Sequence, residues 1–265
     1  MVLEISTFLY LSLLSFIQGI TEFLPISSSA HLLVLPHILD VSDQGIIIDV
    51  AAHIGSLIAV CYFYRKDIMD IIKNLFSKNK EESQLFFKVS IAFIPLFLLG
   101  IVMYFGNFKE LRNPKIVIYT SLIFGILLYI ADIYGSKKRD LKKLTYLDAF
   151  FIGLTQILSV IPGVSRSGST MTMAMFCGQK RTSAVKFAFL LSIPTISLVG
   201  LGGIVEFISS PIKINVLYLL YTIVLSFIFS LFAIKFMIRW IEKSSFKIFA
   251  IYRILFAILL FFILK

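Results

Sequence analysis

Charged residues are scarce in this sequence: they fill 15% of its 265 positions, whereas 58% of the positions are hydrophobic. The mean hydropathy is +0.95. A water-soluble domain of this length needs a far more polar surface, so that class of protein is excluded. The apolar residues extend along the whole chain and leave no room for a separate soluble domain. We therefore expect a single membrane domain over residues 1–265.

The sequence also lacks short segments in which polar and apolar residues alternate, which is the pattern of a transmembrane β-barrel. The apolar residues form long continuous runs instead. Because every backbone polar group inside lipid has to be satisfied within the protein, such runs are predicted to form helices. The expected fold is an all-α polytopic membrane protein. Only two cysteines occur, Cys61 and Cys177, and we interpret both as packing residues in or beside apolar runs.

Acidic residues are fewer than basic residues, 15 against 25, which gives a formal net charge of +10. No nucleic-acid partner is expected from this charge, because the cations gather in short loops between apolar runs, as the positive-inside rule describes. The basic loops, which we place in the cytoplasm, are residues 65–88, 135–146, 180–186 and 239–247. The loops with few cations, which we place outside, are residues 40–44, 106–115 and 206–215.

Six apolar runs are long enough to cross a bilayer as helices. They are residues 45–64, 89–105, 116–134, 184–208, 216–238 and 248–264. Two further stretches, residues 8–39 and 147–178, are interrupted, the first at Pro25 and the second at Pro162 and Gly163. Each half of an interrupted stretch has the length of a re-entrant helix. The loop charges place both ends of the second stretch in the cytoplasm and, by parity, both ends of the first stretch outside.

The two halves of the chain, about residues 1–134 and 135–265, thus have the same plan in opposite orientation. Each half contains a re-entrant helical hairpin followed by three transmembrane helices, which is an inverted repeat. A short similarity supports this reading, since GITE at residues 19–22 matches GLTQ at residues 153–156. Non-helical backbone at membrane depth has to be buried in protein or to line a wet cavity. The tips of the two hairpins are therefore expected to form one polar chamber.

The first hairpin carries polar side chains at helical spacing. Gln18 and Glu22 are four residues apart and share a helix face. A proline ends this helix, and Ser27 is a suitable N-cap for the returning helix. On that helix Ser28 lies three residues from His31, and Ser27 lies four residues from it. Either hydroxyl could reach the imidazole, which is the arrangement that an activated nucleophile requires.

The second hairpin contains an arginine, glycines and hydroxyl groups in the run PGVSRSGST at residues 162–170. Glycines allow close approach to the backbone, and amide groups at the start of a helix bind anions. Arg166 adds a planar guanidinium suited to phosphate oxygens. An arginine at membrane depth costs at least roughly 2.5–3.5 kcal/mol on insertion scales, so an anion should offset its charge. The candidates are Glu22 and a substrate diphosphate.

Taken singly, these residues also fit structural roles. Glu22 and Arg166 could pair as a buried strut between the hairpins. The serines could be helix-packing residues, and His31 could be a hydrogen-bonded residue of the bundle. The joint pattern of both hairpins favours a catalytic site over these alternatives. A structural role is favoured for three residues near the expected entrance: His37, Asp49 and His53.

The two hairpins resemble the two signature motifs of the BacA-type undecaprenyl-diphosphate phosphatases. The first motif is Gln18 and Glu22 with the run PISSSAH at residues 25–31, and the second is the run at residues 162–170. The resemblance extends over nearly the full chain in length, span order and motif placement. It implies an integral-membrane phosphatase that converts undecaprenyl diphosphate, a polyprenyl diphosphate, to the monophosphate lipid carrier. Such an activity recycles the carrier for cell-wall synthesis and confers bacitracin resistance.

The resemblance implies roles for the residues of the first motif. Glu22 would be the essential acid and Gln18 its partner, and both would hold a divalent cation, Mg²⁺ or Ca²⁺. Because the family accepts Glu or Gln at the position of Gln18, the glutamine weakens a metal site made of two carboxylates. Ser28 would be the nucleophile, with Ser27 as the alternative, and His31 would be the base.

For the second motif, the resemblance implies that Arg166 acts in catalysis and also binds the diphosphate. The other residues expected to bind the substrate are Gly163, Ser165, Ser167 and Thr170. The resemblance further implies a multi-pass protein of the cell membrane, with membrane lipids around it and a site open to the outer face. A homodimer is left open.

Two other classes of function are left open by the sequence. Inverted repeats with broken helices are typical of secondary transporters, so a polyprenyl-phosphate flippase or an anion transporter is the first alternative. A membrane assembly protein with a buried polar strut is the second. A transporter has no need of a serine and a histidine beside a carboxylate, which favours the enzyme. The sequence does not decide between a phosphoserine intermediate and direct attack by water.

Overall fold

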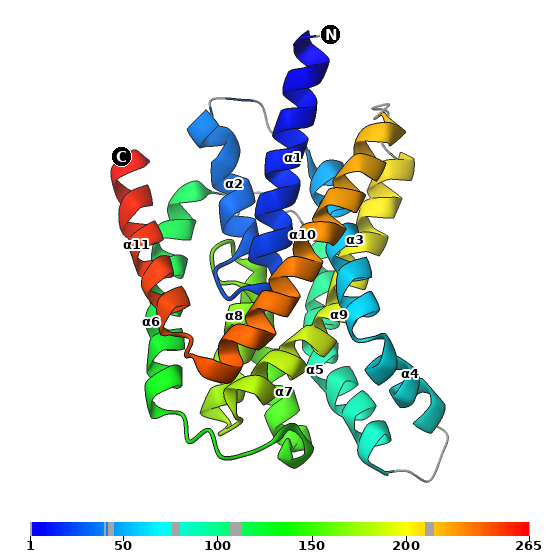
Figure 1. Ribbon diagram of the computed structural model, residues 1–265, viewed down its shortest axis with the longest axis vertical. Helices are drawn as coiled ribbons and strands as arrows, with labels where there is room; N and C mark the ends of the chain where they lie inside the picture. The colour runs from blue at the N-terminus through cyan, green and yellow to red at the C-terminus, as the bar shows by residue number, and fades with distance from the viewer. Residues whose placement is uncertain are drawn as a thin grey trace.

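The computed structural model of the protein describes residues 2–39, 41, 45–75, 80–106, 113–209 and 215–264. These parts of the chain are helical and contain no β-strand (Figure 1). The helices are α1 (Val2–Phe23), α2 (Ser28–Leu39), α3 (Ile46–Phe63), α4 (Arg65–Asn74), α5 (Lys80–Phe105), α6 (Pro114–Tyr134), α7 (Tyr146–Ile157), α8 (Arg166–Phe176), α9 (Arg181–Ser209), α10 (Val216–Lys243) and α11 (Lys247–Ile263). Two short 3-10 helices, η2 (Leu141–Lys143) and η3 (Leu158–Val160), flank α7. The predicted all-α fold is confirmed.

Within the described residues, five helices are long and apolar enough to cross a membrane. They are Ile46–Phe63, Ser83–Met103, Pro114–Tyr134, Arg181–Ser209 and Val216–Lys243. These helices coincide with five of the six predicted spans. The sixth predicted span coincides with α11, an apolar helix of 17 residues. The protein is therefore a multi-pass membrane protein, as predicted.

The two interrupted stretches fold into helix pairs, α1 with α2 and α7 with α8. Figure 1 shows the first pair reaching the middle of the molecule from the upper end of the view and the second pair reaching it from the lower end. We call residues 24–27 the first turn and residues 161–165 the second turn. Each helix pair is followed by three long helices, α3, α5 and α6 in one half and α9, α10 and α11 in the other. A symmetry relation between the two halves stays a prediction.

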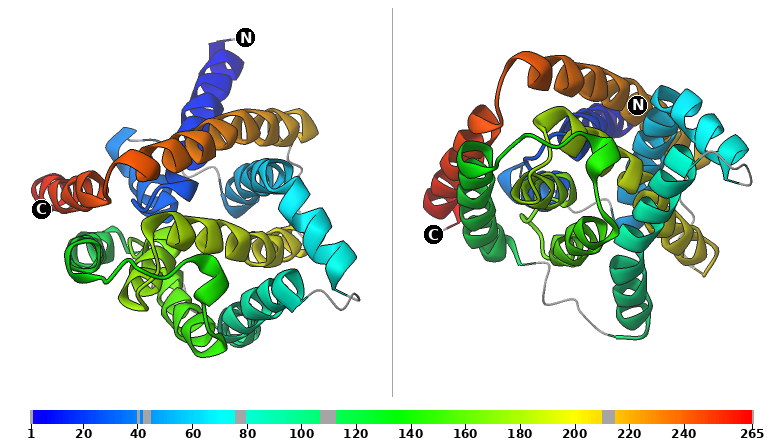
Figure 2. Two further views of the ribbon diagram at one scale, coloured as in Figure 1. Left: turned by 60° about the horizontal axis from the view of Figure 1, so that its bottom comes forward. Right: turned by 90° about the horizontal axis from the view of Figure 1, so that it is seen from below.

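Small residues allow the helices to pack closely around the turns. A Cβ atom on Gly55 of α3 would lie 2.3 Å from the carbonyl oxygen of Ile223 in α10. One on Gly153 of α7 would lie 2.2 Å from the carbonyl oxygen of Ala92 in α5. Such contacts are common between membrane helices, because close packing rather than the hydrophobic effect holds helices together in lipid. Seen from below, α8 lies inside a ring of other helices (Figure 2), and eight of its 11 residues are buried.

Candidate active site

Both turns contain a serine with a left-handed backbone. The φ angle is 75° at Ser27 and 71° at Ser165. Ser27 Oγ accepts a hydrogen bond from the Ala30 N–H at 3.4 Å, and Ser165 Oγ accepts one from the Gly168 N–H at 3.0 Å. Each serine therefore caps the helix that follows its turn, which confirms the predicted N-cap at Ser27. Residues other than glycine rarely adopt this backbone, and functional sites are among the places where they do.

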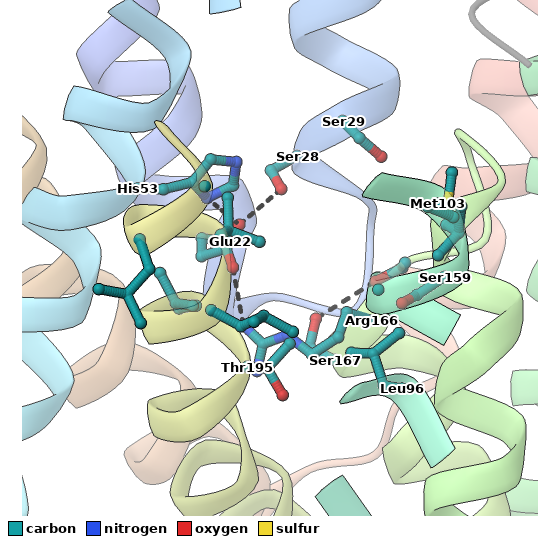
Figure 3. A pocket seen from close by; sticks show the side chains of 18 of the residues that line it. Glu22, Ser28, Ser29, His53, Leu96, Met103, Ser159, Arg166, Ser167 and Thr195 are labelled. Atoms are coloured by element: carbon teal, nitrogen blue, oxygen red, sulfur yellow. Dashed lines mark hydrogen bonds and ion pairs between the residues drawn. The ribbon is translucent and has the colours of Figure 1, made fainter. Parts of the chain in front are cut away.

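An ion pair between Glu22 and Arg166 joins the two hairpins. Glu22 lies near the end of α1, Arg166 is the first residue of α8, and Arg166 Nη2 donates to Glu22 Oε1 at 2.7 Å. Only 6% of the Glu22 side chain and 10% of the Arg166 side chain are exposed. Figure 3 shows Glu22 between Ser28 and Arg166. Of the two anions predicted to offset the charge of Arg166, Glu22 is thus one that contacts it.

The second carboxylate oxygen of Glu22 accepts two further hydrogen bonds. Ser28 Oγ donates to Glu22 Oε2 at 2.6 Å, and Gln18 Nε2 donates to the same oxygen at 3.0 Å. Gln18 and Glu22 thus share a face of α1, as their spacing predicts. The Gln18 amide nitrogen also lies 2.8 Å from His53 Nδ1 on α3. Since an amide nitrogen only donates, His53 Nδ1 is the acceptor in this contact.

The predicted contact between a serine hydroxyl and His31 does not form. His31 Nδ1 lies 2.7 Å from the carbonyl oxygen of Ser27, so this nitrogen carries the hydrogen. His31 Nε2 lies 2.7 Å from the hydroxyl of Tyr252, and the ring stacks on Phe256 with centroids 4.5 Å apart. The helical spacing allows Ser28 to reach His31, but the carboxylate of Glu22 is the stronger partner for its hydroxyl. The pairing of Ser28 with His31 was a wrong expectation, whereas the roles of the two residues stay predictions.

The predicted binding residues of the second hairpin fall into two groups. Ser165, Arg166 and Ser167 line a cavity, and Ser167 Oγ donates to the carbonyl oxygen of Leu24 in the first turn at 3.0 Å. Thr170 is buried, and its hydroxyl donates to carbonyl oxygens of its own helix. Gly163 does not line the cavity and lies against α6.

The reason that residue 163 is glycine is its packing against α6. Its φ angle is 90°, and a Cβ atom there would lie 2.0 Å from Thr120 Oγ1. Thr120 Oγ1 in turn donates to the carbonyl oxygen of Pro162 at 2.7 Å. A larger residue at position 163 would push α6 away from the second turn. The structure therefore assigns Gly163 to the support of the turn rather than to the cavity wall.

The cavity has a volume of about 590 Å³ and two chemically different parts. Its polar part contains Glu22, Ser28, His53 and the start of α8 (Figure 3). Its apolar part lies between α5 and α9. Residues of this apolar part, which we call the apolar arm, are Leu96, Ile101, Met103, Ile196, Leu198, Val199, Leu201, Gly202 and Val205. The site can therefore hold a ligand with an anionic head and a hydrocarbon chain.

Sequence reasoning missed several residues of this site. His53, for which a structural role was favoured, lines the cavity beside Glu22. The signal for it was an ionisable residue inside an apolar span, which is a functional candidate by default. The same signal applied to Arg253 in the last span. Ser159 and Thr195 also line the cavity, but nothing in the local pattern sets them apart from packing residues. His37, in contrast, is an exposed residue near the end of α2.

The site offers few groups to a metal ion. No cluster of three or more His, Cys, Asp or Glu side chains suited to a metal occurs among the described residues. Glu22 supplies one carboxylate, and the buried amide oxygen of Gln18 has no hydrogen-bond partner. Mg²⁺ and Ca²⁺ bind oxygen ligands, and Mg²⁺ is often held by one or two carboxylates together with substrate phosphates. These residues therefore fit a cation shared with a phosphate ligand, but not a cation held by the protein alone.

Comparison with known proteins agrees with this geometry. The family model described as bacitracin resistance protein BacA matches residues 11–259. An undecaprenyl-diphosphatase of Pelagibacter ubique is 38% identical over 261 residues, which cover 98% of this chain and 98% of that protein. An undecaprenyl-diphosphatase of Saccharophagus degradans is 40% identical over 248 residues, covering 91% and 92% of the two chains. The match to the family model begins within α1 and ends within α11, so it includes both turns. The chain therefore belongs to the BacA family.

Proposed function

We propose that this protein is an integral-membrane phosphatase that hydrolyses undecaprenyl diphosphate to undecaprenyl monophosphate and phosphate. The observation that carries the proposal is the cavity in which the Glu22, Ser28 and Arg166 cluster adjoins an apolar arm. A polyprenyl diphosphate has the matching division between a charged head and a hydrocarbon tail. Relatives named undecaprenyl-diphosphatase cover almost the whole chain, which supports the same substrate.

The diphosphate binds at the start of α8 in this proposal. Arg166 offers a guanidinium to the phosphate oxygens, and Ser165 and Ser167 offer hydroxyl groups beside it. The first amides of a helix have no partners inside that helix and carry a partial positive charge. Together these groups stabilise the negative charge on the terminal phosphate in the transition state.

Ser28 is the nucleophile in the mechanism that we propose. The diphosphate competes with Glu22 for Arg166. We assign the role of the base to Glu22 rather than to His31, because the ring nitrogens of His31 contact the Ser27 carbonyl and the Tyr252 hydroxyl and not Ser28. Ser28 Oγ attacks the terminal phosphorus while its proton passes to Glu22 Oε2, 2.6 Å away. The bond between this phosphorus and the bridging oxygen breaks, and the lipid monophosphate leaves with the electron pair and takes the proton from Glu22. Water then cleaves the phosphoserine, which releases phosphate and restores the hydroxyl of Ser28.

A divalent cation, Mg²⁺ or Ca²⁺, would be held by Glu22 and the amide oxygen of Gln18 together with phosphate oxygens. When bound, it would neutralise part of the charge of the diphosphate. The unpartnered amide oxygen of Gln18 supports this placement, because a buried acceptor without a partner is rare in proteins.

We place the protein in the cell membrane with the cavity open to the outer face. Ion pairs connect three of the predicted cytoplasmic loops to one another. Lys186 pairs with Asp67 at 2.5 Å, and Lys142 pairs with Glu81 at 2.7 Å. The first helix pair reaches the middle from the opposite end of the molecule (Figure 1). In this orientation the enzyme would act on the diphosphate carrier at the outer face and recycle it for cell-envelope synthesis. Removal of that lipid also accounts for bacitracin resistance.

Phosphate release from undecaprenyl diphosphate by the purified protein in detergent tests the function. Release is expected with added Mg²⁺ or Ca²⁺ and is expected to stop when a chelator removes the cation. No release with either cation would contradict the proposal. Movement of the intact lipid across a reconstituted bilayer without phosphate release would favour the flippase alternative instead.

The substitution Gly202→Phe tests the apolar arm. Gly202 lines the cavity, and a Cβ atom there would meet no atom within 4 Å, so the new side chain starts in open space. We expect KM for undecaprenyl diphosphate to rise about tenfold or more, because steric overfilling costs roughly 1–3 kcal/mol. The value for farnesyl diphosphate should change much less, since its tail is short.

Ile204→Phe is the matched control on the same helix, because Ile204 is exposed and does not line the cavity. It should leave both KM values near those of the wild type. Equal effects of Gly202→Phe on the long and the short substrate would show that the tail lies elsewhere.

A further inference from the structure

A buried arginine of α11 contacts both turns at once. Only 1% of Arg253 is exposed. Its Nη1 donates to the carbonyl oxygen of Pro25 in the first turn at 3.3 Å. Its Nη2 donates to the carbonyl oxygens of Gly163 at 2.6 Å and Val164 at 3.0 Å in the second turn. One guanidinium thus connects the tips of two hairpins that enter the molecule from opposite ends.

The charge of Arg253 has no carboxylate partner among the described residues, where its hydrogen bonds go to backbone carbonyl oxygens. Removing a cation from solvent without a counter-ion is costly, and simple packing of the turns would not need it. An apolar side chain would fill the same space, but it could not satisfy three carbonyl oxygens at fixed positions. The arrangement therefore indicates that Arg253 is needed to hold the backbone of the two turns in one relative position.

The hydrogen bond to Val164 also orients the next amide group. In a planar trans peptide the C=O and the following N–H point in opposite directions. Because the Val164 carbonyl points to Arg253, the N–H of Ser165 points away from Arg253. Within the described part of the chain this N–H has no acceptor, and Ser165 lines the cavity. Arg253 thus fixes the direction of an amide at the proposed phosphate-binding end of α8.

We propose that Arg253 is a positioning residue of the phosphatase. It holds the first turn, which carries Glu22 and Ser28 on its two flanks, at a fixed distance from the second turn and Arg166. It does so without touching the substrate, since it does not line the cavity. The proposal rests on the proposed function, because Arg253 would align the nucleophile with the phosphate-binding groups at the start of α8.

The substitution Arg253→Lys tests the proposal, since lysine keeps the charge but cannot reach three carbonyl oxygens with a planar fork. We expect kcat for undecaprenyl diphosphate to fall about 100-fold, the effect of a misplacement of reacting groups by roughly 1 Å. KM should change less than about threefold, because the groups that bind the tail and the phosphates remain. Thermal unfolding in detergent, measured on the same preparation, reports how much protein is folded.

Arg181→Lys is the matched control, because Arg181 is a partly buried arginine that donates to Asp132 at 2.5 Å far from the turns. It should leave kcat unchanged. A folded Arg253→Lys protein with unchanged kcat would overturn the positioning role, as would a rise in KM alone. An inactive wild-type protein would instead overturn the proposed function itself.

If Arg253→Lys does not fold, Arg253→Ala purified with guanidinium keeps the test decisive. Guanidinium can occupy the space of the missing side chain and donate to the same carbonyl oxygens. Recovery of kcat with guanidinium, but not with ammonium at the same concentration, supports the proposal. Absence of recovery, or equal recovery with both ions, would overturn it.

Discussion

The double variant Glu22→Gln with Arg166→Met is expected to fold as stably as the wild type and to release no measurable phosphate. Replacing both partners of a buried ion pair with neutral groups is often neutral or stabilising, whereas removing one partner costs roughly 3–5 kcal/mol. Each single variant leaves one charge buried without its partner at 2.7 Å and should unfold at a lower temperature. Thermal unfolding in detergent and phosphate release measure the two effects separately.

This experiment separates a catalytic pair from a structural strut. A strut acts only through stability, so the double variant would then recover activity together with stability. In the proposed mechanism both charges act on the reacting groups, and a cation on a transferring phosphoryl group is worth about 10³-fold to 10⁵-fold in rate. Activity of the double variant close to that of the wild type would therefore contradict the proposed roles of Glu22 and Arg166.

The spans were predictable because the membrane sets their length and lipid demands helices. Loop charge then predicted that both ends of the second interrupted stretch lie on the same side of the membrane, and the prolines and serines predicted the positions of both turns. These signals are local in the sequence, and they reflect the membrane environment rather than tertiary contacts. The contact of Glu22 with Arg166 was predicted as one of two possibilities, because a buried charge needs a partner and a substrate diphosphate was the other candidate.

Contacts that depend on a choice between several partners were not predictable. Helical spacing allowed Ser28 to reach His31. In the structure, however, Ser28 is hydrogen-bonded to Glu22 and His31 is hydrogen-bonded to Tyr252. Tyr252 and Arg253 lie more than two hundred residues from the first turn in the sequence. No spacing rule connects positions that far apart, because the packing of α11 against α6 decides which of its faces reaches the turns. The direction of each polar side chain is thus a tertiary result.

The substitution Ser28→Ala is expected to lower kcat by roughly three orders of magnitude or more, the scale of losing a nucleophile. The fold should persist, because Ser27 rather than Ser28 caps α2 and, among the described residues, the Ser28 hydroxyl bonds only to Glu22. Substrate labelled on the terminal phosphate, mixed with wild-type enzyme and quenched in acid, should leave label on Ser28. The variant should carry no label under the same conditions.

Ser29→Ala is the control for a lost hydroxyl in the same cavity. Ser29 lines the cavity as Ser28 does, but its hydroxyl pairs with Ser27 at 3.2 Å and makes no contact with Glu22. It should keep nearly full activity. If Ser28→Ala retained most of its activity and no label stayed on the protein, water would be the attacking group, and the contact of Ser28 with Glu22 would serve to orient it. Label on Ser27 instead would move the nucleophile to the cap of α2, whose hydroxyl would then have to leave the Ala30 N–H before it could attack.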